Sequence, residues 1–189
     1  GMFAQRGMRR PMGQVVPLGP MPSVEELAGA GAEVVSTREP QWLADDMFYV
    51  SGEIPRTTAY EKGLPGQVGG VADGAWGPGP LLVDERFGSV QVRGKGQFVF
   101  SACSHAGIVN VLRHARSTFP SVPLYGAMGG LHLSGTTEPI IPQTVSDLQQ
   151  FGLRLLAAGH CTGWRAMSAL AQAFGDELVP SAVGKCYVV

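Results

Sequence analysis

The chain has 189 residues, of which 44% are hydrophobic and 15% are charged. This composition predicts one globular domain with a substantial core and excludes a disordered chain. The formal net charge of −1 argues against a nucleic-acid partner, because such surfaces normally carry a basic excess. No apolar run approaches the roughly 18 to 20 residues that cross a bilayer, so no membrane partner is expected. Three cysteines without a spaced framework indicate a reducing, cytoplasmic location rather than a disulfide scaffold.

The first 22 residues predict a flexible arm. Gly1 is interpreted as a cloning scar, and the segment that follows is rich in glycine, proline, methionine and arginine without clear periodicity. A single α/β domain is expected over residues 23–189. It begins with a short helix, for which Ser23 and Glu26 have the spacing of a capping box.

Strands and one long loop are predicted in the first half of the domain. Residues 63–80 are rich in glycine, and because loops of this length are usually functional, we expect a lid or a substrate-contact loop there. Strands are expected at residues 33–36, 47–50, 81–84, 90–93 and 97–100, the last three as a meander whose first turn is at residues 85–89.

The second half alternates strands with helices. Further strands are expected at residues 122–128, 153–158 and 187–189, and helices at residues 108–117, 142–150 and 164–174. This alternation predicts an α/β fold in which crossover helices pack on a sheet that the meander makes mixed.

Three of the four histidines directly follow strand-like runs. His105, His132 and His160 occupy this position, whereas His114 lies inside a predicted helix. Carboxyl ends of parallel strands meet at one edge of a sheet, so we expect the three side chains to lie close together. A single such histidine is more often structural, but three at one edge indicate a site for zinc, iron or manganese.

The strings that carry these histidines resemble a known superfamily. CSHAGIVN, GGLHLSG and GHCTGWRA, with SGEIPR and YEKGLPG upstream, are similar to the metallo-β-lactamase superfamily. The resemblance is greatest to its dihydropterin-ribofuranosylaminobenzene-phosphate synthase-like branch of metal-dependent hydrolases, and it extends from about Pro22 to the carboxyl end. It implies the second half of an αββα sandwich, with a mixed sheet and helices on one face. It also implies a hydrolase-like function on a phosphate-bearing or pterin-type small molecule.

The resemblance also implies a metal site that this chain completes only in part. It makes His105 the third metal-binding position of the superfamily and His160 the last, with His132 in the region of the fourth. The superfamily's first ligands come from a His-x-His-x-Asp-His motif, which this chain lacks. Asp84 is a candidate fourth ligand beside the three histidines. The chain is therefore interpreted as a domain without its amino-terminal half, with the arm as an inter-half linker. It is expected to be inactive alone and to pair as a homodimer or with the missing half.

Residues near the histidines are candidates for substrate contact. Ser104 and Thr162 precede helices, so we expect them to cap those helices and to bind an anionic group of the substrate. Arg56 is a further candidate for that anion, with a surface role as an equal alternative. Glu53 and Glu61 supply charges for a cleft, although surface solvation is the more common role of such residues.

Two alternatives stay open. One is a non-catalytic α/β domain that keeps the fold for binding or assembly. The other is a thiol enzyme in which Cys103 acts with His105 or His160. For Cys103 and Cys161 the favoured interpretation is packing of small side chains at tight turns.

Overall fold

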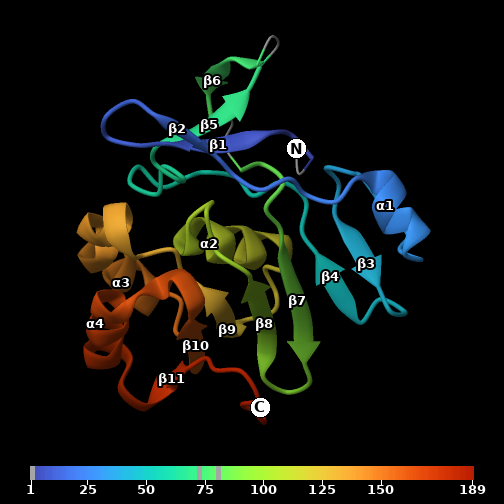
Figure 1. Cartoon of the computed structure of the whole chain (residues 1–189). Coiled ribbons are helices and arrows are strands. Elements are labelled where there is room, and N and C mark those ends of the chain that lie inside the picture. The colour runs from blue at the N-terminus through green and yellow to red at the C-terminus, as the bar shows by residue number, and fades with distance from the viewer. Residues whose placement is uncertain (1–2, 72–73, 80–81) are drawn as a thin grey trace.

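The computed structural model describes residues 3–71, 74–79 and 82–189, and in this part the strands form two sheets (Figure 1). The small sheet contains, in spatial order, β2 (Val15–Pro17), β1 (Arg6–Arg9), β5 (Gln67–Gly70) and β6 (Trp76–Pro78). The large sheet contains, in spatial order, β11 (Leu178–Pro180), β10 (Leu155–Gly159), β9 (Leu124–Gly130), β8 (Gly96–Ser101), β7 (Phe87–Val92), β4 (Phe48–Val50) and β3 (Gln41–Leu43). The helices are α1 (Val24–Gly29), α2 (Ile108–Thr118), α3 (Ile141–Gln149) and α4 (Trp164–Phe174), with 3-10 turns η2 (Gly135–Ile140), η3 (His160–Thr162) and η4 (Gly175–Glu177).

The large sheet is mixed, as the sequence predicts. Strands β8 to β11 are parallel neighbours, whereas β8, β7, β4 and β3 pair antiparallel. The crossovers from β8 through α2, α3 and α4 always step to the next strand in the same direction, and right-handed crossovers then place all three helices on one face. Figure 1 shows α2, α3 and α4 together on that face. The predicted α/β class with helices on one face is confirmed.

The core lies between the parallel strands and these helices. Val99 of β8 and Leu156 of β10 are fully buried against Leu112 of α2, Leu148 of α3 and Leu170 of α4. Such burial stabilises a fold by about 1.5–3 kcal/mol for each large apolar side chain. The parallel strands are therefore held rigidly, and the turns at their carboxyl ends have fixed positions.

The other face of the large sheet is also apolar. The register aligns Leu43 of β3, Phe48 of β4, Val90 of β7 and Phe98 of β8 in one row, and paired residues point to the same side. Phe100 lies two residues beyond Phe98, and the two rings contact each other at 5.1 Å between centroids. Leu43, Phe48 and Phe100 are 53%, 41% and 39% exposed. These residues alternate with those that face the helices, so the row lies on the opposite side of the sheet.

The small sheet is the main departure from the elements predicted along the sequence. Where a flexible arm is expected, β1 and β2 form a hairpin, and β1 also pairs with β5 inside the expected loop at residues 63–80. That segment contains β6 as well as β5. Neither segment alternates apolar and polar residues by itself, because each strand is stabilised chiefly by its partner from a distant part of the chain.

Several strand predictions are wrong in detail. Residues 33–36 and 187–189 are not strands, because β3 and β11 supply the two edges of the large sheet instead. Residues 82–84 form a turn rather than a strand, and residue 81 lies outside the described residues. The expected turn at residues 85–89 is partly strand, since β7 already begins at Phe87.

The predicted helices are confirmed. The capping box of α1 is present, with Ser23 and Glu26 bonded reciprocally. α2, α3 and α4 lie at the predicted positions, and α4 matches the predicted bounds. In the described ranges, no helix combines the length and the apolar character needed to cross a membrane.

Candidate functional site

Three neighbouring parallel strands end in residues with left-handed backbone. Ser104 after β8 has φ 53°, His132 after β9 has φ 49°, and His160 after β10 has φ 52°. Residues other than glycine rarely adopt this backbone conformation. Where they do, the strain is often found at functional sites. The three predicted histidines therefore do collect at one edge of the sheet.

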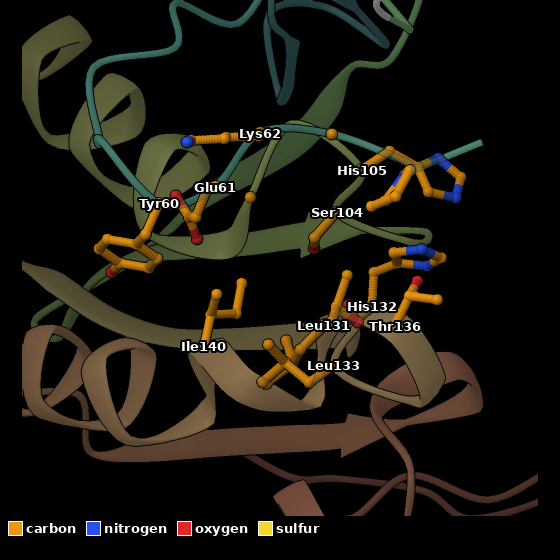
Figure 2. Close-up of a pocket in the computed structure, with 14 residues that line it drawn as sticks. Tyr60, Glu61, Lys62, Ser104, His105, Leu131, His132, Leu133, Thr136 and Ile140 are labelled. Atoms are coloured by element: carbon orange, nitrogen blue, oxygen red, sulfur yellow. Dashed lines mark hydrogen bonds between the residues drawn. The ribbon is translucent and has the colours of Figure 1, made fainter. Parts of the chain in front are cut away.

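His105 and His132 form the centre of the site. Their rings contact edge to face, with 4.6 Å between centroids (Figure 2). Burial lowers the pKa of both imidazoles, so both are neutral at neutral pH, which is the form that binds metals. The Nδ1 atom of His132 is buried and has no hydrogen-bond partner in the described part of the chain. Two neutral imidazoles and an unpaired buried nitrogen fit a divalent transition metal.

Glu85 orients His105, and the sequence analysis missed it. Its carboxylate accepts the backbone N–H groups of His105 at 2.7 Å and of Ala106 at 2.5 Å. Its Oε1 lies 3.5 Å from Nδ1 of His105. Burial raises the pKa of Glu85. A carboxylate beside the second ring nitrogen of a metal-binding histidine fixes the orientation of the ring. No local pattern in the sequence reveals this contact, because the two residues lie in different segments.

Glu61 occupies the amino end of α2. It is 4% exposed, and its carboxylate accepts the N–H groups of Val109 and Asn110 at 2.9 Å each and the hydroxyl of Thr58 at 3.0 Å. Gly107 is required beside it, since a Cβ at that position would overlap the Glu61 carboxylate. The charge that the sequence analysis assigned to a cleft thus anchors the helix.

Ser104 and Thr162 do not cap helices, in contrast to the prediction. α2 and α4 begin after Gly107 and Gly163, and neither N-cap makes a side-chain hydrogen bond. The carboxylate of Glu61 already accepts N–H groups of the first turn of α2, and that of Glu85 accepts the N–H groups just before the helix. An anionic ligand would therefore compete with these carboxylates for the amino end of α2.

The two hydroxyls instead join neighbouring strand ends. Ser104 donates to the carbonyl of Gly130 at 2.7 Å. Thr162 donates to the carbonyl of Gly159 at 2.7 Å and accepts the N–H of Leu131 at 3.1 Å. Both side chains are buried. They lock the three histidine-bearing turns to one another, and Ser104 also lines the pocket described below.

Arg56 and Asp84 are both engaged within the protein. Arg56 donates from Nη1 to the backbone carbonyl of His105 at 3.0 Å. Asp84 pairs with Arg6, with 2.6 Å between Nη2 and Oδ1. Arg56 therefore supports the turn that carries His105, and Asp84 is held by an arginine from the small sheet rather than aimed at the histidine pair.

His160 lies beside the two turn cysteines. Its Nε2 is 3.1 Å from Sγ of Cys103, and Sγ of Cys161 is 3.6 Å from the same sulfur atom. Burial raises the pKa of the Cys103 thiol to about 12. A thiol of this kind is protonated at neutral pH and is a weak nucleophile, which argues against the thiol-enzyme alternative.

A pocket of about 180 Å³ adjoins the histidine pair. Figure 2 shows His105 and His132 at one end, with the chain segment of Tyr60, Glu61 and Lys62 along one side. The opposite wall is apolar and is lined by Leu131, Leu133 and Ile140. This segment carries the string YEKGLPG, but Tyr60 and Lys62 could not be predicted as lining residues, because only the fold brings them over the strand ends.

Comparisons with known proteins agree with this architecture, although no family model matches the chain. The crystal structure of a metal-dependent hydrolase of the β-lactamase superfamily matches 98% of this chain and 67% of its own, with a TM-score of 0.78 and 20% sequence identity. The chain therefore has the fold of the metallo-β-lactamase superfamily.

Two curated proteins are similar to this chain in sequence. The chain is 29% identical over 103 residues to 7,8-dihydropterin-6-methyl-4-(β-D-ribofuranosyl)-aminobenzene-5′-phosphate synthase of Methanocaldococcus jannaschii, a match that covers 54% of this chain and 35% of the relative. It is 27% identical over 154 residues to an uncharacterized protein of the same organism, which covers 82% of this chain and 54% of the relative. The resemblance predicted from the motifs is confirmed. The chain spans between a third and about half of the length of these curated relatives.

Proposed function

We propose that this chain is the carboxyl-terminal portion of a metal-dependent hydrolase-like protein that holds a divalent transition metal at its histidine-bearing strand ends. The observation that carries the proposal is the convergence of His105 and His132, with Nδ1 of His132 buried and without a hydrogen-bond partner among the described residues. His160, after the next parallel strand, is the third predicted ligand. The likeness to a metal-dependent hydrolase supports the same class of chemistry.

Each residue of the site has a defined part in this function. When bound, zinc, iron or manganese supplies a Lewis acid that polarises a carbonyl or phosphoryl oxygen and lowers the pKa of a bound water. His105 and His132 offer neutral nitrogen donors, and Glu85 holds the His105 ring in place. Arg56 fixes the carbonyl of the same turn. These contacts preorganise the donors, so little reorganisation is needed when the ion binds.

The pocket favours a small substrate with one apolar and one anionic part. Its apolar wall excludes water from a flat ring system, and Lys62 places an ammonium group over the opposite side. A phosphate-bearing or pterin-type molecule has this character. The name of the synthase from Methanocaldococcus jannaschii supports the choice.

The isolated chain is proposed to be inactive until it pairs with another chain. A two-metal hydrolase site needs more ligands than the three predicted histidines supply. A homodimer, or an amino-terminal half with the motif absent here, supplies the rest. The three free cysteines fit a reducing cytoplasm.

Metal content tests the proposal directly. We expect inductively coupled plasma mass spectrometry of the purified chain to find a transition metal, and the double variant H105A/H132A to lose about one ion per chain. His114→Ala is the matched control, because His114 lies on α2 away from the strand ends and packs on Phe87. An unchanged metal content in the double variant would contradict the proposed site and favour a non-catalytic binding or assembly domain.

A further inference from the structure

Cys103, His160 and Cys161 form a second cluster of donor atoms at the same sheet edge. Their ligand atoms all lie within 4.8 Å of one another. From the sequence, the two cysteines are expected to be packing residues, and His160 is expected to act with the other histidines. In the structure, Nε2 of His160 contacts a sulfur atom instead.

The fold brings these two cysteines together across an intervening strand. Cys103 follows β8 and Cys161 follows β10, while β9 lies between them. A Cβ at Gly130, the last residue of β9, would lie 2.7 Å from Sγ of Cys161 and 2.8 Å from the carbonyl of Ala102. Because Gly130 has no side chain, the turns that carry Cys103 and Cys161 have room to approach each other.

The spacing of the donor atoms fits a tetrahedral metal ion. Zinc binds sulfur at about 2.3 Å and histidine nitrogen at about 2.0 Å. The edges of such a tetrahedron are about 3.8 Å between two sulfur atoms and about 3.5 Å between sulfur and nitrogen. The structure has 3.6 Å between the sulfur atoms of Cys103 and Cys161, and 3.1 Å between Nε2 of His160 and Sγ of Cys103. Small shifts of side chains would complete the coordination.

We propose that Cys103, Cys161 and His160 form a thiolate-rich site for a thiophilic divalent cation such as Zn²⁺, with the fourth position open to solvent. Both cysteines are half-buried and His160 is exposed, so an ion can enter from the solvent side. Binding converts both thiols to thiolates and releases two protons to solvent, while the imidazole binds in its neutral form. Two thiolates with one imidazole select zinc over magnesium or calcium, which prefer oxygen ligands.

This site shares His160 with the predicted ligands of the hydrolase site and differs from that site in its two sulfur donors. His105 and His132 contribute no atom to it. The H105A/H132A variant therefore tests the proposed function, whereas the cysteine variants described next test the thiolate site.

Cobalt substitution gives a readout that only sulfur ligands produce. We expect Co²⁺ added to the reduced, chelator-treated chain to give thiolate-to-metal charge-transfer absorption with the strong visible bands of tetrahedral cobalt. Cys103→Ser and Cys161→Ser should each reduce the charge-transfer absorption by about half and weaken Zn²⁺ binding at least about tenfold, or roughly 1.4 kcal/mol. Cys186→Ser is the matched control, because Cys186 is exposed and lies outside the cluster. The H105A/H132A variant should keep the absorption.

Alkylation of the unaltered chain tests the site without substitution. We expect Zn²⁺ to protect Cys103 and Cys161, but not Cys186, from a thiol reagent, as mapped by mass spectrometry of the peptides. The proposal is overturned if the unaltered chain shows no charge-transfer absorption or if Zn²⁺ protects no cysteine. It is also overturned if Cys103 and Cys161 form a disulfide that persists when the chain is prepared with a reductant and Zn²⁺.

Discussion

Glu61 anchors the start of α2. Its two carboxylate oxygens accept two N–H groups of the first turn, in a position where water has little access. Removing the carboxylate leaves both donors without partners, and each unpaired buried group costs about 1–3 kcal/mol. We therefore expect Glu61→Ala to lower the free energy of unfolding by roughly 2–5 kcal/mol, as measured by urea denaturation.

Glu53→Ala is the matched control for this prediction. Glu53 carries the same carboxylate in the same stretch of chain but is exposed. Substitutions at such positions usually change stability by less than about 0.5 kcal/mol. Equal losses in the Glu61 and Glu53 variants would show that the anchor at α2 is unimportant.

His114 makes stability depend on pH. Burial lowers the pKa of its imidazole, and its ring packs against Phe87 with 5.6 Å between centroids. In the unfolded chain, His114 takes up a proton at about pH 6.5. In the folded protein it does so only at a lower pH. Between these values the unfolded state binds more protons, so the free energy of unfolding falls as the pH falls.

We expect His114→Phe to flatten that decline. The variant keeps an aromatic ring against Phe87 but has no group to titrate. Urea midpoints at about pH 7 and about pH 5.5, on either side of the ordinary histidine pKa, measure the slope. His105 and His132 also have lowered pKa values and remain in both proteins, so the difference between the two slopes isolates His114. Equal slopes in the unaltered protein and the variant would contradict the assignment of this pH dependence to His114.

At the scale of elements, local sequence patterns predicted the parallel half of the fold. α4 is encoded by an amphipathic run that Gly175 ends, and α1 by the reciprocal bonds of its capping box. Such signals lie within a few residues of one another, so they can be recognised in the sequence alone. The histidine positions could be predicted for the same reason, since each follows a strand directly.

Contacts between distant segments could not be predicted in this way. β1 pairs with β5, which places Gly7 opposite Val68, and neither strand has an apolar alternation of its own. Glu85 precedes β7 and His105 follows β8, so their contact depends on the pairing of these two strands. The meeting of Cys103 and Cys161 likewise depends on the strand order β8-β9-β10. These features depend on tertiary pairing, for which one sequence carries no local signal.

The end of β9 offers a test of how tightly the turns are packed. We expect Gly130→Ala to destabilise the protein by about 1–3 kcal/mol, because the added methyl group overpacks the space beside Cys161. Gly88→Ala, in β7, is the matched control, since a Cβ there meets its nearest neighbour, the carbonyl oxygen of Tyr49, only at 4.0 Å. Thermal unfolding of both variants measures the difference. A Gly130 variant as stable as the Gly88 variant would show that the turns can separate without cost.

At the scale of the whole molecule, the two faces of the large sheet differ in how they are covered. Helices α2, α3 and α4 pack on one face, and the row from Leu43 to Phe98 lies on the other. Exposed apolar patches of more than a few hundred Å² usually bind a partner. In the αββα architecture implied by the fold, this second face packs against another sheet. The proposed homodimer and the proposed amino-terminal half both use the same surface.

The oligomeric state tests whether a second copy occupies this surface. We expect the unaltered chain to be a dimer at micromolar concentration in size-exclusion chromatography with light scattering. The double variant L43K/F48K should raise the dissociation constant at least about 100-fold, because it places two charges in the proposed apolar contact. Leu43 and Phe48 are cross-strand partners and both are exposed, so their replacement leaves the core intact. Val183→Lys, at a fully exposed apolar residue beyond β11, is the control and should leave the dimer unchanged. A monomeric unaltered chain would contradict the homodimer, and binding of a separately expressed amino-terminal half through the same two residues would then identify the partner.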